Sequence, residues 1–231
     1  MMTELVYIHI PKTGGSSVRV KLSMVYGASE QHHIITHTPF GGDSHFISPD
    51  SVMFSDHAGF RKAINQSLEG VRDPAVLYAH LPVWTLEDVL PGVPRITVVR
   101  DPIEHLLSTV FFWKNSNPNH PKSKLPGSEL VFDSMFWNTQ SLYVGGVALK
   151  NFALVGITER LEEFLVAAAK MFSWPDGDCN IHDGKGPKRF REERARLRAD
   201  KGLCDALMKR NYWDVALYNL AKSRWHENRY H

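Results

Sequence analysis

The chain has 231 residues, of which 43% are hydrophobic and 23% charged, a composition typical of a globular protein with a large core. The formal net charge of +2 is too small to indicate nucleic-acid binding. Two cysteines, Cys179 and Cys204, exclude a disulfide framework or a four-cysteine zinc site. No run reaches the roughly 18 apolar residues of a membrane span. The first residues also do not have the pattern of a leader peptide. We therefore expect one cytoplasmic domain over residues 1–231.

The first 26 residues combine a strand signal with a helix signal. Residues 5–10 are an apolar run typical of a buried strand. Pro11 lacks a backbone N–H, so we expect the strand to end there. Apolar residues at helical spacing predict a helix over residues 16–26, capped by Ser16 or Ser17.

The turn between this strand and this helix has the composition of an anion-binding loop. Two adjacent glycines allow the backbone to approach a ligand closely, and a helix N-terminus attracts negative charge. A lysine adds a full positive charge, and hydroxyl groups add donors. An ordinary glycine turn is the alternative reading. We predict that the following residues bind a phosphate or sulfate: Lys12, Thr13, Gly14, Gly15, Ser16 and Ser17.

Strands that alternate with helices predict an α/β fold, with a P-loop-like central parallel sheet flanked by helices. His80 follows a predicted strand directly, which places it at the carboxyl edge of the sheet, where ligands of open α/β folds bind. Thr85 and Thr158 are expected to cap helices, and Trp213 is expected to face inward. Further strands are predicted at 75–79, 95–100 and 151–157. Helices are predicted at 58–68, 85–90, from 102 onward, 132–144, 159–170, 190–199 and 203–223, and loops at 27–56, 115–129 and 175–187.

Two stretches resemble the sulfotransferases that use 3′-phosphoadenylyl sulfate (PAPS). Residues 11–17 read Pro-Lys-Thr-Gly-Gly-Ser-Ser and resemble the 5′-phosphosulfate loop of that family. The lysine precedes the glycines, whereas in the usual P-loop it follows them. Residues 97–108 read Thr-Val-Val-Arg-Asp-Pro-Ile-Glu-His-Leu-Leu-Ser and resemble the 3′-phosphate motif of the same family.

The resemblance implies roles for individual residues. Arg100 and Ser108 match the arginine and serine that hold the 3′-phosphate, and an arginine offers phosphate a planar fork of donors. His105 departs from the pattern, because the family usually has arginine there. His80 matches the histidine that serves as general base in the glycan branch, which includes the uronosyl 2-O-sulfotransferases; a core histidine is the alternative.

The function that the resemblance implies is in-line transfer of the sulfuryl group from PAPS to an acceptor hydroxyl. Lys12 would stabilise the leaving phosphate, and 3′-phosphoadenosine 5′-phosphate (PAP) would be the product. The acceptor is expected to be a glycan or glycolipid. Relatives close a basic loop over the 3′-phosphate, for which the candidates are Lys185, Lys188 and Arg189. A solvated charge run, or a contact with the acceptor, is the alternative for this loop.

Other functions remain open at this stage. His33 and His37 have a spacing that chelates metals on helices, but the residues between them favour a strand, so we expect no metal site. A P-loop kinase that uses ATP and Mg²⁺ is one alternative, and a PAPS-binding module without turnover is another. Many glycan sulfotransferases carry an amino-terminal anchor, so a trimmed catalytic domain is the alternative to a cytoplasmic protein. The sequence leaves the acceptor and the oligomeric state open.

Overall fold

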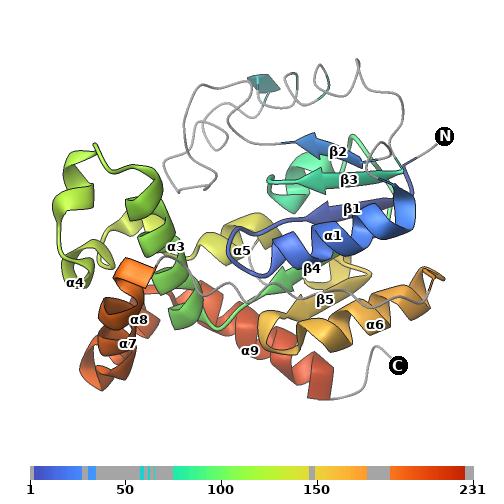
Figure 1. Ribbon diagram of the computed structural model, residues 1–231. Coiled ribbons are helices and arrows are strands. Elements are labelled where there is room, and N and C mark those ends of the chain that lie inside the picture. The colour runs from blue at the N-terminus through green and yellow to red at the C-terminus, as the bar shows by residue number, and fades with distance from the viewer. Residues whose placement is uncertain are drawn as a thin grey trace.

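A computed structural model describes residues 3–27, 31–34, 58–59, 62, 65, 75–145, 149–175 and 188–226. Within these ranges, five parallel strands form one sheet in the order β2-β3-β1-β4-β5 (Figure 1). The predicted α/β fold with a P-loop-like parallel sheet is therefore confirmed. The strands are β1 (Leu5–Ile8), β2 (Gln31–Ile34), β3 (Val76–Ala79), β4 (Arg95–Val99) and β5 (Leu154–Ile157).

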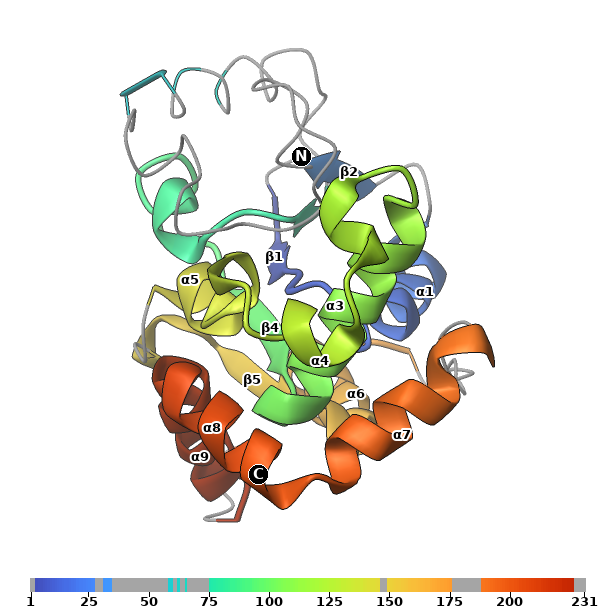
Figure 2. The same ribbon diagram turned by 90° about the vertical axis from the view of Figure 1, so that its left-hand side faces the viewer.

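Helices cover both faces of the sheet. The pair α1 and α6 lies on one face, and α5 and α9 lie on the other (Figure 2). A further group, α3, α4, α7 and α8, gathers beyond the carboxyl ends of the strands (Figure 1). The helices are α1 (Gly15–Tyr26), α3 (Pro102–Ser116), α4 (Gly127–Leu130), α5 (Thr139–Val144), α6 (Leu161–Met171), α7 (Arg191–Ala199), α8 (Lys201–Arg210) and α9 (Tyr212–His226).

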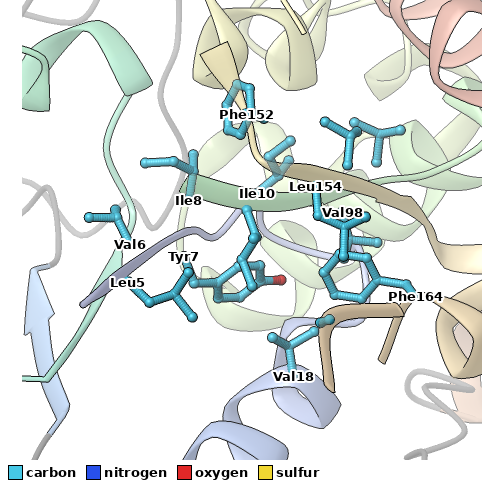
Figure 3. Packing of buried hydrophobic residues seen from close by; sticks show 14 of the residues in the cluster. Leu5, Val6, Tyr7, Ile8, Ile10, Val18, Val98, Phe152, Leu154 and Phe164 are labelled. Atoms are coloured by element: carbon cyan, nitrogen blue, oxygen red, sulfur yellow. The ribbon is translucent and has the colours of Figure 1, made fainter. Parts of the chain in front are cut away.

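The sheet is buried on both sides, as its apolar strands require. Every residue of β1 and β4 is buried, and Tyr7, Ile10 and Phe164 pack together between the sheet and its helices (Figure 3). A second apolar cluster joins α3 to α7 and α8 through residues such as Val110 and Leu197. This second cluster fixes the helices that stand over the carboxyl edge of the sheet.

Three predicted helix caps are wrong. Helix α1 begins one residue earlier than predicted, with Gly14 as its N-cap, so Ser16 and Ser17 lie inside its first turn. Thr85 lies within a 3₁₀ turn, Val83–Leu86, and its hydroxyl donates to Pro82 O. Thr158 begins another such turn. Its hydroxyl donates to backbone carbonyls, whereas a capping hydroxyl would accept from a helix amide.

Some predicted segment types also need correction. The single helix predicted at 203–223 is two helices, α8 and α9, which meet at Asn211. Asn211 and Asp214 occupy the inner positions of this junction, so Trp213 is 53% exposed instead of buried. The predicted loop 115–129 contains a 3₁₀ turn, Pro121–Lys124, and helix α4. The predicted helix 132–144 is a 3₁₀ turn, Ser134–Phe136, followed by α5.

Three predicted segments are described only in part. Within the predicted loop 27–56, residues Gln31–Ile34 form the edge strand β2. Of the helix predicted at 58–68, the four described residues are helical. Apart from Gly27, the other residues of these segments, and all but the first of the predicted loop 175–187, lie outside the described residues. In the described part of the chain, no helix has the length and apolar character to cross a membrane.

Candidate active site

The loop between β1 and α1 is shaped by its own backbone. Gly14 has φ 90° and Lys12 has φ 68°, a left-handed conformation that is uncommon outside glycine. The buried Thr13 hydroxyl donates to Ile10 O at 2.8 Å and closes the turn. Gly14 O accepts from Ser17 N at 3.0 Å and thereby starts α1. The earlier N–H groups of the helix have no acceptor within it, which is the arrangement that attracts an anion.

Conformation favours glycine at position 14, where φ is positive, and packing requires it at position 15. A Cβ atom on Gly15 would lie 1.9 Å from His9 Nε2, so the His9 ring lies directly against the Gly15 backbone. A Cβ atom on Gly14 would lie 2.9 Å from Leu161 on α6. Any larger residue at position 15 would displace either the loop or His9.

Arg100 joins the two stretches singled out in the sequence. It follows β4 directly, and its Nη1 donates to Lys12 O at 3.1 Å, across 88 residues of sequence. Both residues therefore lie at the carboxyl edge of the sheet. Ser108, two turns further along α3, is buried and shares a helix face with Phe112. The Lys12 ammonium lies 4.4 Å from the centre of the Phe112 ring, so this face of α3 looks onto the loop.

Positive charge is concentrated around this contact. Arg194 on α7 is 3.6 Å from Glu104, which also pairs with Arg198 at 3.0 Å and with Arg100 at 3.6 Å. Three arginines thus share one carboxylate. Burial lowers the pKa of Lys12, and the positive charges of Arg100 and Arg194 lower it further. A bound anion would relieve this repulsion.

The sequence did not single out Arg194 as a site residue. It is half-buried, and its own pKa is lowered by burial and by Arg100. Its helix carries arginines at 191, 194 and 198, a spacing that places all three on one side of α7. That pattern is also typical of a solvated helix face, so only the tertiary structure distinguishes Arg194 from its neighbours.

His105, which departs from the family pattern, supports the loop without adding charge. Its Nε2 lies 2.9 Å from Pro11 O, and because a carbonyl only accepts, Nε2 carries the proton. Burial lowers the pKa of His105 to about 3. The hydrogen bond to Pro11 O raises this pKa, while the charges of Arg100 and Lys12 lower it further. The imidazole is therefore neutral at physiological pH. His105 thus adds no positive charge to the loop, and the charges that act on it are those of Arg100 and Lys12.

His80 does not stand alone at the edge of the sheet. Its Nε2 lies 2.7 Å from Nδ1 of His9, and the two rings meet edge to face. His9, at the end of β1, was not identified from the sequence, although it lies only three residues before Lys12. Through His9, the candidate base is connected to the Gly15 backbone, so His80 belongs to the same site as the loop.

Thr158 connects a third strand to the loop. Its hydroxyl lies 3.0 Å from Thr13 O and 3.1 Å from Val99 O, so it bridges the loop and the end of β4. This contact explains why Thr158 does not cap α6.

The late basic loop is described only at its end. Lys185 lies outside the described residues, and the backbone of Lys188 begins a 3₁₀ turn, Lys188–Phe190, while its side chain is not described. Arg189 donates to Asn115 Oδ1 at 2.7 Å, near the end of α3. Its contact with a 3′-phosphate stays a prediction.

His33 and His37, the pair with metal-chelating spacing, lie largely outside the described residues. The His33 backbone belongs to β2, its side chain is not described, and His37 lies outside the described residues. Among the residues that are described, no group of three or more histidine, cysteine or acidic side chains has the arrangement of a metal site.

The fold and the loop define a class of protein: an α/β protein with a P-loop-like glycine turn at the carboxyl edge of a parallel sheet. The solved structure of a sulfotransferase from Alicyclobacillus acidocaldarius is similar, with 15% sequence identity and a TM-score of 0.46. The similarity covers 91% of this chain and 97% of that chain. No protein-family model and no curated protein matches the sequence. At this identity and TM-score the likeness carries no functional weight, so function is inferred from the site itself.

Proposed function

We propose that the protein is a sulfotransferase that moves the sulfuryl group of PAPS to a hydroxyl of a carbohydrate acceptor. The observation that carries the proposal is the hydrogen bond between Arg100 Nη1 and Lys12 O, which brings the two family-like stretches into one site. Each stretch alone also fits an ordinary structural role that involves no ligand. Together they form one region with an excess of positive charge and a glycine turn, which suits a ligand with two anionic ends.

The residues of the site fit such a donor. The His9 ring packs against the Gly15 backbone, and the N–H groups at the start of α1, which have no acceptor within the helix, suit an anion. Burial lowers the pKa of Lys12 most, and the positive charges of Arg100 and Arg194, which a phosphosulfate would balance, lower it further. Arg100, with Arg194 beside it, offers forked donors suited to the 3′-phosphate, and Ser108 offers a hydroxyl.

The proposed chemistry divides between the loop and the histidines. PAPS supplies an activated sulfuryl group on a 5′-phosphate that is a good leaving group. Lys12 and the N–H groups at the start of α1 stabilise the charge that develops on that leaving oxygen. His80 accepts the proton of the attacking hydroxyl as the new S–O bond forms and the old one breaks. Because Nε2 of His80 is hydrogen-bonded to Nδ1 of His9, the two rings act as one proton-accepting pair.

Thermal unfolding with added nucleotides tests the proposal first. PAP should raise the melting temperature by mass action, and adenosine should not. Stabilisation by ATP with Mg²⁺ but not by PAP would contradict the proposal and favour a kinase.

An acceptor screen with radiolabelled PAPS completes the test, using glycans, glycolipids and tyrosyl peptides. We expect label on carbohydrate hydroxyls. Binding of PAP without transfer to any acceptor would instead indicate a binding module.

A further inference from the structure

Gln140 holds the backbone of Arg100 in a way that the catalytic scheme above does not use. The side chain of Gln140, on α5, is fully buried. Its Oε1 accepts from Arg100 N at 2.8 Å, and its Nε2 donates to Arg100 O at 3.0 Å. One amide side chain therefore satisfies both polar groups of the residue that follows β4. Since Arg100 lies beyond the last residue of that strand, this pair of bonds replaces the support of a strand neighbour.

Helix α5, in turn, is fixed by α9 through reciprocal capping. Gln140 and Ser141 lie in the first turn of α5, and Asp214 on α9 accepts from their backbone amides at 3.2 and 2.8 Å. Asn138, the N-cap of α5, accepts in return from Trp213 N at 3.0 Å and Asp214 N at 3.4 Å, in the first turn of α9. Each helix start is thus satisfied by a side chain of the other helix. Neither start can shift without breaking its hydrogen bonds to the amides of the other helix.

These contacts form a continuous path from the last helix to the guanidinium. Asp214 sets the start of α5, Gln140 holds the Arg100 peptide, and the Arg100 side chain reaches Lys12 O. A leucine at position 140 would fill nearly the same volume but would leave the Arg100 N–H and C=O buried without partners. The Arg100 backbone would then move toward other partners or water, and its side chain would move with it.

We propose that Gln140 is a positioning residue that sets Arg100 for the 3′-phosphate, and that the reciprocal capping of α5 and α9 sets Gln140. The inference deepens the proposed function, because it rests on Arg100 as the 3′-phosphate ligand. It assigns to the C-terminal helix a specific influence on one end of the nucleotide. The 5′ end, held by the loop and α1, should be insensitive to Gln140.

The test compares two nucleotides that differ in the 3′-phosphate. Isothermal titration of the full chain with PAP and with adenosine 5′-monophosphate (AMP) separates the two ends of the site. We expect Gln140→Leu to weaken PAP about tenfold and to leave AMP within about twofold. In an Arg100→Ala background, Gln140→Leu should not weaken PAP binding any further. Gln31→Leu is the matched control: Gln31 lies on the edge strand β2, away from β4, and donates to Ser23 Oγ on α1, so its loss should change neither affinity.

An equal loss of PAP and AMP affinity would overturn the inference, as would an additive loss in the Arg100→Ala background. Asp214→Asn serves as a second variant in case Gln140→Leu does not fold. It keeps one acceptor oxygen and should weaken PAP by about threefold, again with AMP unchanged.

Amide hydrogen exchange of the ligand-free chain separates this inference from the proposed function. Gln140→Leu should speed exchange at the Arg100 N–H while leaving Val98 protected, and unchanged exchange at Arg100 would refute the positioning role. If the wild type binds no PAP, the proposed function fails and the 3′-phosphate role of Arg100 fails with it. The exchange result would still decide whether Gln140 fixes the Arg100 backbone.

Discussion

The two halves of the site are built in different ways. The loop half, residues 11–15, is one contiguous turn whose shape comes from its own glycines and from Thr13. The arginine half is assembled from the end of β4, from α3 and from α7, with α5 holding it from behind. The loop half therefore depends on local backbone geometry, whereas the arginine half depends on how remote helices dock. Mutations in the two halves should accordingly fail in different ways.

The largest effect is expected from Gly15→Ala in the loop half. The added methyl group would overlap the His9 ring, so the loop and the pair formed by His9 and His80 cannot both keep their positions. We expect more than a hundredfold loss of transfer and about 3 kcal/mol loss of unfolding free energy. Sulfuryl transfer assays and chemical denaturation measure the two effects.

Gly202→Ala on α8 is the matched control, because a methyl group there meets only Asp200 at 3.6 Å. It should keep full activity and gain up to about 1 kcal/mol of stability. Full activity in Gly15→Ala would show that the loop does not need its observed shape.

The next largest effect is a dependence of the free energy of unfolding on pH, caused by His105 behind the loop. Its pKa is about 3 when folded and near 6.5 when unfolded, so the unfolded chain binds the extra proton between these values. The free energy of unfolding should therefore fall as the pH drops below 6.5, by about 3 kcal/mol at pH 4. Denaturation of wild type and His105→Gln across this range checks the prediction. The variant should lack this part of the slope, and parallel curves would contradict the neutral, buried imidazole.

Asp214, which supports the arginine half, should act with the opposite sign. Burial raises the pKa of Asp214 to about 6, against the lowering effect of the Ser141 and Gln140 amides, whereas an unfolded aspartate has its ordinary value of 3.8. The folded chain then binds the extra proton, so the free energy of unfolding should fall as the pH rises from 4 to 6. We expect about 2 kcal/mol over this window, absent in Asp214→Asn. Denaturation midpoints at several pH values measure it, and identical slopes in wild type and variant would rule it out.

The smallest effect is expected from Arg194→Ala in the arginine half. Removing one of three arginines around Glu104 should weaken PAP about tenfold and leave AMP unchanged, because the charge lies near the 3′-phosphate end. Arg196→Ala, on the exposed side of the same helix, is the control and should change neither affinity. Titration calorimetry distinguishes them, and an equal effect of both variants would reduce Arg194 to general surface charge.

The loop half could be predicted from the sequence because its signals are adjacent. A strand, a proline and two glycines within a few residues predict a tight turn between strand and helix, while anion binding by this turn and its lysine stays a prediction. Arg100 and Ser108 were singled out by the resemblance to the 3′-phosphate motif, and the structure places them after β4 and within α3, while their role as phosphate ligands stays a prediction. The parallel sheet followed from the alternation of apolar runs with helical patterns.

The rest depends on contacts that no local pattern encodes. Thr158 precedes a helix, as a capping threonine does, but the carbonyls of Thr13 and Val99 lie within reach of its hydroxyl. Gln140 has an ordinary place in a short helix, and only the docking of α5 brings it to Arg100.

The central claim is that the two halves bind opposite ends of one nucleotide. It is tested most directly by titrating wild type and Arg100→Ala with both PAP and AMP. The account predicts that wild type prefers PAP by about tenfold or more and that Arg100→Ala loses this preference while still binding AMP. Equal affinity of the wild-type protein for the two nucleotides would contradict it.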